Sequence, residues 1–246
     1  MASAASVMFA APGVRAEQAR GGDAALAALM QRHAELFLQR SPEQATNFNW
    51  DVGAHAALRG RLDDRSLAAM DRDRIAIAAA QAQLRRIDRT TLSPAATLDY
   101  DVAAFVYDQF ADIFGRYGYI DIDLRPSPYV VSQMNGSYYW MPDFIGSAHP
   151  IATAADIDAW YARLAGLAVA LDQETDRIRH DAGIGVIPPD FVIVRAVSQI
   201  RALRDTPPRQ SALMVDAIAR ARAKGLGDIG VRGAAIFAAQ VAPALT

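Results

Sequence analysis

Hydrophobic positions recur along most of this chain at the three-to-four-residue spacing of an α-helix. The first clear helical segment is 23–40, and the sequence SPEQ at 41–44 then restarts the chain. Serine, proline and glutamine at these positions are typical of an N-cap, a first-turn proline and a capping box. After a connection without clear periodicity at 48–62, a second long helix is expected over 65–88.

The strongest helical patterns lie in the middle of the chain. Ser93 with Pro94 predicts the start of a helix, and Thr153 with Asp156 predicts another, each with a side chain that caps the first turn. The first of these helices carries an apolar stripe of more than five turns, formed by Leu98, Val102, Phe105, Val106, Phe110, Ile113, Phe114 and Tyr117. The pattern predicts further helices from Pro188-Pro189 to Pro207-Pro208, over 211–224 and over 228–245.

Between 118 and 146 the helical period stops, and only YIDIDL at 119–124 alternates in the manner of a short strand. We therefore expect an all-α fold, an irregular multi-helix array of long antiparallel helices with at most one short β-hairpin near 117–131. No internal repeat, low-complexity linker or change of composition divides the chain. One helical unit over 17–246 is the prediction.

The segment NGSYYWMPDFIGSAHPI at 135–151 combines three consecutive aromatic residues with two prolines. Proline removes a backbone donor and restricts the preceding residue, so we expect a loop here and neither a regular helix nor a central strand. Two interpretations remain open: a wall that contacts a ligand, or a loop pinned into the core. The candidate substrate-binding residues are Tyr138, Tyr139, Trp140 and His149.

The spacing of polar residues argues against a catalytic centre in this chain. No two of the four histidines, His33, His55, His149 and His180, lie three to five residues apart, so the zinc-binding H-E-x-x-H pattern is absent. The nucleophile elbow, the P-loop and the dinucleotide-binding glycine pattern are absent as well. The sequence predicts no catalytic residue and no metal ligand.

The remaining ionisable candidates have structural interpretations. His33 is expected to pack on a helix stripe, and His180 to interact with the C-terminal end of a helix. Asp99 and Asp101 point apart on a helix, whereas Asp121 and Asp123 would share one face of a strand and are interpreted as solvated carboxylates.

Composition narrows the class of protein. Hydrophobic residues make up 52% of the 246 and charged residues 21%, which excludes a disordered chain. The net charge of -2 is spread over interspersed charges, so nucleic acid is not an expected partner. Nothing after the first residues approaches the roughly 20 apolar residues of a membrane span. Cysteine is absent, which excludes disulfides and thiolate metal sites.

Residues 1–16 are small and apolar, and they end in Val14-Arg15-Ala16, a pattern typical of signal peptidase sites. The basic residues that usually begin a signal peptide are missing. A signal peptide therefore predicts a periplasmic or secreted protein, whereas a disordered leader would leave a cytoplasmic one.

Five sequence blocks together resemble a bacterial family known as domain of unknown function 885 (DUF885). They are SPEQAT at 41–46, LSPAATLDYDV at 92–102, YVVSQMNG at 129–136, DFIGSAHPIATAADIDAWYARL at 143–164 and GIGVIPPDFVI at 183–193. The blocks occur in family order and cover the N-terminal half of the family's pattern, over about 200 residues of this chain.

The resemblance implies a large helical, zincin-like protein that is often exported and has an H-E-x-x-P-G-H motif in its C-terminal half. That motif is absent from this sequence. By resemblance, this chain is the N-terminal substrate-channel portion of an exported zinc metallopeptidase and is not catalytic by itself. It holds no cofactor, zinc is expected only in the missing C-terminal half, and the implied partners are that half or a peptide substrate. The alternative is a standalone periplasmic helical binding or scaffold protein.

Overall fold

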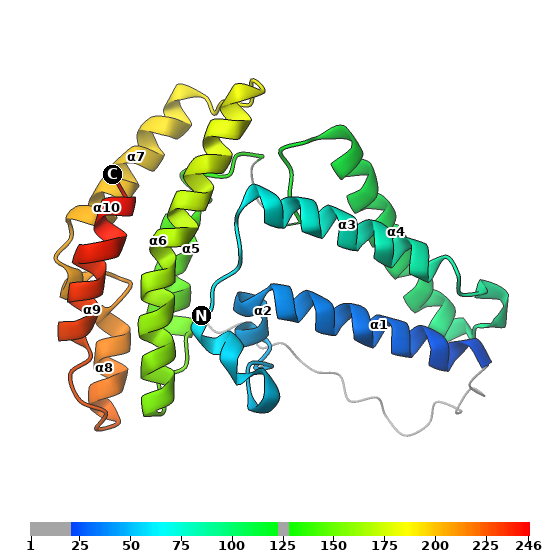
Figure 1. Cartoon of the computed structure of the whole chain (residues 1–246), viewed down its shortest axis with the longest axis horizontal. Coiled ribbons are helices and arrows are strands. Elements are labelled where there is room, and N and C mark those ends of the chain that lie inside the picture. The colour runs from blue at the N-terminus through cyan, green and yellow to red at the C-terminus, as the bar shows by residue number, and fades with distance from the viewer. Residues whose placement is uncertain (1–20, 123–127) are drawn as a thin grey trace.

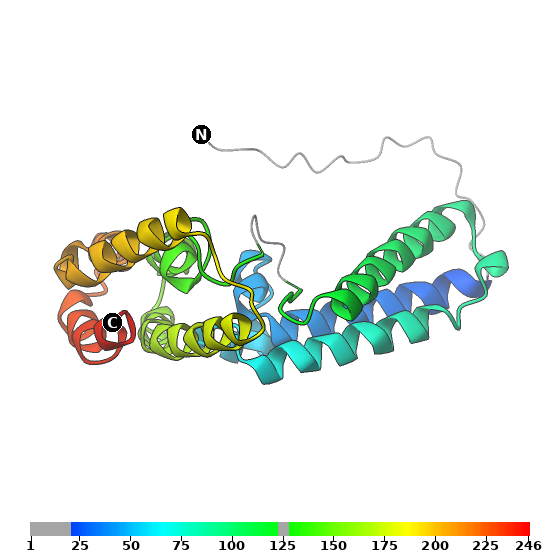
Figure 2. The same cartoon turned by 90° about the horizontal axis from the view of Figure 1, so that it is seen from above.

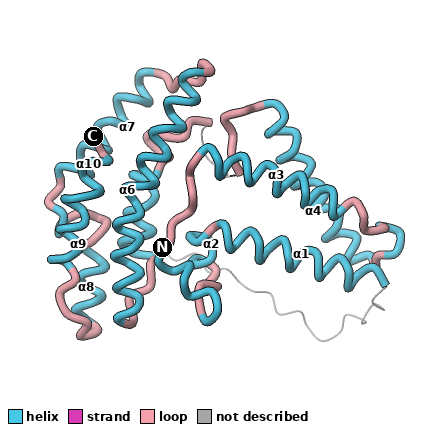
Figure 3. Tube along the Cα trace, in the orientation of Figure 1, coloured by secondary structure: helices cyan, strands magenta, loops and turns pink. Residues whose placement is uncertain are grey.

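The computed structural model describes residues 21–122 and 128–246. Throughout these ranges the regular structure is helical, and no strand occurs in them (Figures 1 and 3). The helices fall into two groups with separate cores, which Figure 2 shows side by side. The predicted all-α class is thus confirmed.

The first group contains three long helices, α1 (Gly21–Arg40), α3 (Leu67–Leu84) and α4 (Pro94–Arg116). Its small core consists of Leu26 and Leu29 from α1, with Leu84 and Leu92 from the end of α3 and the following turn. The predicted cap of α4 is present, because the Ser93 side chain accepts a hydrogen bond from the Ala96 N–H.

The short helix α2 (Pro42–Asn47) follows α1, but the predicted capping box at 41–44 is wrong. The Ser41 side chain accepts no hydrogen bond from the first turn. Asp63 takes that role, since the Glu43 N–H donates to its Oδ1 at 3.0 Å, and the Asp63 N–H donates to Glu43 Oε1 at 3.0 Å. A residue distant in sequence has replaced the local cap.

The second group surrounds the 30-residue helix α6 (Ala154–Gly183), whose predicted capping box between Thr153 and Asp156 is confirmed. Trp160, Leu164 and Leu167 on α6 are fully buried in the larger core. The other members of this group are α5 (Ser137–Asp143), α7 (Asp190–Asp205), α8 (Val215–Ala223), α9 (Gly230–Ile236) and α10 (Ala242–Ala244). A 3₁₀ segment, η1 (Gly53–Gly60), packs on α6 and joins the two groups.

The aromatic segment is not the irregular loop that its prolines predict. Residues 137–143 form α5, with Pro142 inside it, and Phe144–Ala148 continue as a π-helical turn. The wider turn directly after Pro142 is one way in which a helix accommodates a missing donor and a bulky ring. His149 then adopts an extended ψ of 128° before Pro150, as expected of a residue that precedes proline.

The expected strand is also absent where it is described, because 119–122 contains no strand. Asp123 and Leu124 lie outside the described residues. The segment after them contains one isolated antiparallel bridge, between Ser132 and Asn135. A bridge of this size is a tight turn and not a sheet.

The apolar stripe of α4 faces solvent along much of its length. Leu98, Val102 and Phe105 are exposed, Phe105 by 65%, and α4 has no fully buried residue. Its inward side instead contributes Tyr100, Ala103, Ala104 and Tyr107, which pack partly buried against the small core. None of the described helices is long and apolar enough to cross a membrane.

Candidate functional site

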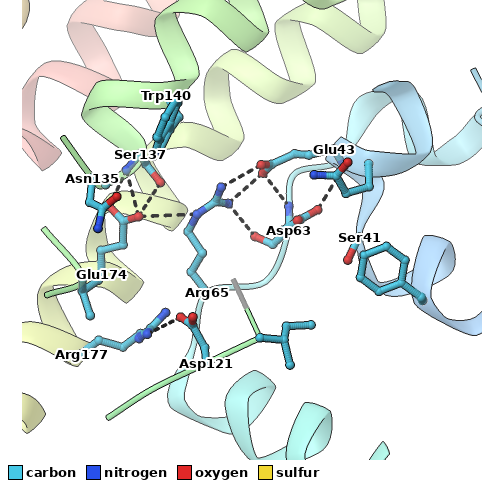
Figure 4. Close-up of a pocket in the computed structure, with 15 residues that line it drawn as sticks. Ser41, Glu43, Asp63, Arg65, Asp121, Asn135, Ser137, Trp140, Glu174 and Arg177 are labelled. Carbon is cyan, nitrogen blue, oxygen red and sulfur yellow. Dashed lines mark hydrogen bonds and ion pairs between the residues drawn. The ribbon is translucent and has the colours of Figure 1, made fainter. Parts of the chain in front are cut away.

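A polar cavity of about 420 Å³ lies where the two groups of helices meet (Figure 4). Its lining comes from the end of α1, from α2 and the residue before it, from the 61–66 segment, from residues 121–122 and 130–136, and from α5 and α6. The lining residues are Phe37, Ser41, Glu43, Gln44, Asp63, Arg65, Asp121, Ile122, Val130, Asn135, Gly136, Ser137, Trp140, Glu174 and Arg177.

Arg65 lies between two carboxylates from opposite sides of the cavity. Its Nη1 is 2.8 Å from Glu43 Oε1 on α2, and its Nε is 3.5 Å from Glu174 Oε1 on α6. Glu174 also accepts hydrogen bonds from the backbone N–H and the hydroxyl of Ser137 at the start of α5. Three elements that are distant in sequence are therefore joined through one guanidinium group.

The electrostatics of this cluster are those of a buried network. Burial opposes the charged form of Arg65, but the Glu43 and Glu174 carboxylates outweigh it and raise the pKa of Arg65 above its usual value. Burial also raises the pKa of Glu174, and Arg65 and the Ser137 hydrogen bonds offset this only in part. Charge pairing between largely buried side chains therefore holds the cluster in shape.

A second ion pair lines the same cavity as the Arg65 cluster. Arg177 on α6 donates from Nη2 to Asp121, and both side chains are almost fully buried. The sequence predicts a solvated carboxylate at Asp121, and this prediction is wrong, because the chain brings Asp121 against Arg177 on α6. Its predicted companion Asp123 lies outside the described residues.

The four aromatic-segment candidates do not all reach the cavity. Trp140 lines it and is 49% exposed, and Tyr139 lies next to Trp140 at 4.9 Å between ring centres in an edge-to-face arrangement. Tyr138 is buried and donates its hydroxyl to the Ser132 carbonyl. His149 is fully buried. Packing accounts for Tyr138 and His149, and ligand contact stays a prediction that fits Trp140.

His149 belongs to a separate buried network. Its Nδ1 accepts a hydrogen bond from Arg163 Nη1 at 2.9 Å, and its Nε2 donates to the Asp156 carbonyl at 2.9 Å. This pair of contacts assigns the neutral tautomer with the proton on Nε2. Burial is the main reason that the pKa of His149 is lowered to about 4.

Arg163 connects His149 to α2 and to the 61–66 segment. Its Nη2 donates to the Thr46 hydroxyl at 2.6 Å, and its Nε donates to the Arg61 carbonyl at 2.9 Å. The guanidinium group also lies over the Phe144 ring, 4.7 Å from its centre. Sequence periodicity placed Arg163 on a helix without indicating any role.

His33 and His180 each lie within hydrogen-bonding distance of a neighbouring side chain. His33 Nδ1 lies 2.8 Å from the Tyr107 hydroxyl, and His180, at the end of α6, lies 3.1 Å from the Asp181 carboxylate. In the described part of the chain, no three His, Asp or Glu side chains are grouped as ligands of a metal ion. These residues do not fit a zinc ion.

The sequence model of a bacterial family described as a protein of unknown function, DUF885, matches residues 42–246. The chain belongs to the DUF885 family. The match includes every residue of the cavity except Phe37 and Ser41. No curated protein gives a significant match.

A solved structure supports the same fold for this DUF885 chain. It is "the putative lipoprotein from Colwellia psychrerythraea", with 15% sequence identity and a TM-score of 0.78. The alignment covers 92% of the DUF885 chain but only 40% of the Colwellia chain. At this identity the likeness concerns the fold alone, and the DUF885 chain spans less than half the length of that protein.

Most cavity residues of the DUF885 chain were not singled out by sequence. Glu43 and Glu174 lie 131 positions apart, and no spacing rule connects them with Arg65 at 65. The available signal was indirect, since SPEQAT and YVVSQMNG, two of the blocks typical of the family, both contribute to the cavity.

Proposed function

We propose that this chain is the N-terminal substrate-channel portion of an exported zinc metallopeptidase of the DUF885 family, and that it contributes a wall of the channel without performing chemistry. The observation that carries the proposal is the cavity between the two helix groups, polar within and flanked by the half-exposed Trp140. A cleft with a few convergent polar groups and an aromatic wall is the usual form of a ligand site.

Two further observations support it. The chain corresponds in fold to 40% of a longer solved protein, so in such a protein further polypeptide accompanies this fold. The exposed apolar stripe on α4, which includes Leu98, Val102 and Phe105, is a surface that such polypeptide would cover. Export is supported by the signal-peptidase pattern at Val14-Arg15-Ala16, and the similar Colwellia protein is described as a lipoprotein.

The test begins with the protein that the native organism produces from this gene. An antibody against residues 21–246 is expected to detect, in the periplasmic fraction, a protein longer than this chain, whose gene encodes H-E-x-x-P-G-H downstream. That longer protein should hydrolyse internally quenched peptides and lose activity with a chelator, whereas the 246-residue chain should hydrolyse none. A native protein of this length, with no such motif encoded downstream, would favour the standalone binding or scaffold protein instead. Hydrolysis by the short chain alone would refute the proposal.

A further inference from the structure

The Ser41 hydroxyl is not needed for the structure of the helix that it precedes. Asp63 caps α2 in its place, and Ser41 makes no side-chain hydrogen bond within the described residues. The residue is only 7% exposed and lines the polar cavity. Within the described residues its hydroxyl is therefore available to a ligand in the cavity.

Arg177 presents a similar group from the other side of the cavity. Its Nη2 is engaged by Asp121, but its Nε–H is buried without an acceptor in the part of the chain that the structure describes. Ser41, directly before α2, and Arg177 on α6 lie on opposite sides of the cavity (Figure 4), so an oxygen-bearing ligand between them would contact both groups. A hydroxyl and a guanidinium group together suit a carbonyl oxygen and its neighbouring amide.

The cavity continues into an apolar groove. Phe37 and Ile122 line both spaces, and the groove, of about 540 Å³, runs between α1, α3 and α4. Small and aliphatic side chains dominate its walls, among them Ala34, Ala76 and Ile77. A peptide has a polar backbone and can carry apolar side chains. Its backbone would suit the polar cavity, and an apolar side chain would suit the groove. A saccharide would bring hydroxyl groups to a groove that offers them few partners.

We propose that the cavity and the groove form one site for an extended peptide, in which the backbone lies between Ser41 and Arg177 under Trp140. The neighbouring aliphatic side chain passes Phe37 and enters the groove. This inference rests on the proposed function and deepens it, because it assigns a preference for an aliphatic residue to this chain and not to the catalytic part.

The experiment uses the 246-residue chain and two capped tripeptides, acetyl-Gly-Leu-Gly-amide and acetyl-Gly-Ser-Gly-amide, in calorimetric titrations. The leucine peptide is expected to bind at least about tenfold more tightly, because only its side chain buries apolar surface in the groove. Ser41→Ala and Trp140→Ala should each weaken binding of the leucine peptide by about fivefold or more. Ser41→Ala should leave the melting temperature unchanged, since its hydroxyl caps nothing.

The matched control is Phe48→Ala. Phe48 is an exposed aromatic residue that lines neither the cavity nor the groove, so this variant should bind the leucine peptide as tightly as the unsubstituted chain does. Equal affinity for the two peptides, or unchanged affinity in both site variants, overturns the proposal. Tighter binding of maltotriose than of the leucine peptide, lost in Trp140→Ala, also overturns it in favour of a saccharide site. These binding results are measured separately from hydrolysis by the longer protein, so failure of this inference is distinguishable from failure of the proposed function.

Discussion

His149 should make this protein sensitive to mild acid. Its pKa is lowered from 6.5 to about 4 by burial, so the folded protein keeps the imidazole neutral while the unfolded chain takes up a proton. The unfolded state then binds more protons between these two values, and stability falls as the pH is lowered through that window. The contribution is fully present above pH 6.5 and is lost progressively below it.

The magnitude follows from the same shift. A difference of about 2.5 pKa units corresponds to about 3 kcal/mol when the loss is complete, and about 2 kcal/mol of it is lost between pH 7 and pH 5. Burial is the main cause, and the Arg163 contact acts in the same direction, because a protonated Nδ1 can no longer accept from Arg163. The added charge would face the guanidinium groups of Arg163 and Arg59, with Asp156 as the opposing carboxylate.

Urea unfolding followed by far-UV circular dichroism at pH 7, 6 and 5 measures this loss. His149→Gln should be less stable than the unsubstituted chain at pH 7, because the buried Arg163 donor loses its partner. The difference should shrink by about 2 kcal/mol at pH 5, since the variant has no imidazole to titrate. His180→Gln is the control, as its side chain is 39% exposed. A difference between His149→Gln and the unsubstituted chain that is constant with pH would refute the reasoning.

Two further perturbations test the packing and the charge cluster. Gly146→Ala places a Cβ against the Ala212 carbonyl oxygen, closer than van der Waals contact allows, so a loss of about 1 to 3 kcal/mol in the unfolding free energy is expected. Gly183→Ala meets open space and should change the unfolding free energy by no more than about 1 kcal/mol. Equal melting temperatures of these two variants would contradict the close approach at 146. Arg65→Met leaves the buried Glu174 carboxylate without its cation and should cost about 3 to 5 kcal/mol at pH 7 in urea unfolding. The cost should decrease at pH 5, because burial already raises the pKa of Glu174 and protonation removes the unpaired charge, and an increase at pH 5 would contradict this assignment.

The sequence determined the helices and most of their ends, because those features depend on residues close together in the chain. Periodic apolar positions predicted α1, α3, α4 and α6, and the caps at Ser93 and Thr153 formed as expected. A side chain that reaches the N–H three residues later needs no tertiary partner. The absence of a sheet in the described residues follows from the same local preferences.

Only the tertiary structure decided where a residue distant in sequence overrides the local preference of the chain. Asp63 displaced Ser41 as a cap because its segment folds back against α2, and packing against α6 made the proline-containing aromatic segment helical. The cavity likewise joins Glu43, Arg65 and Glu174, whose separation in sequence carries no signal of contact. Charge pairing and burial act through space, so the site exists only once the two groups of helices have come together.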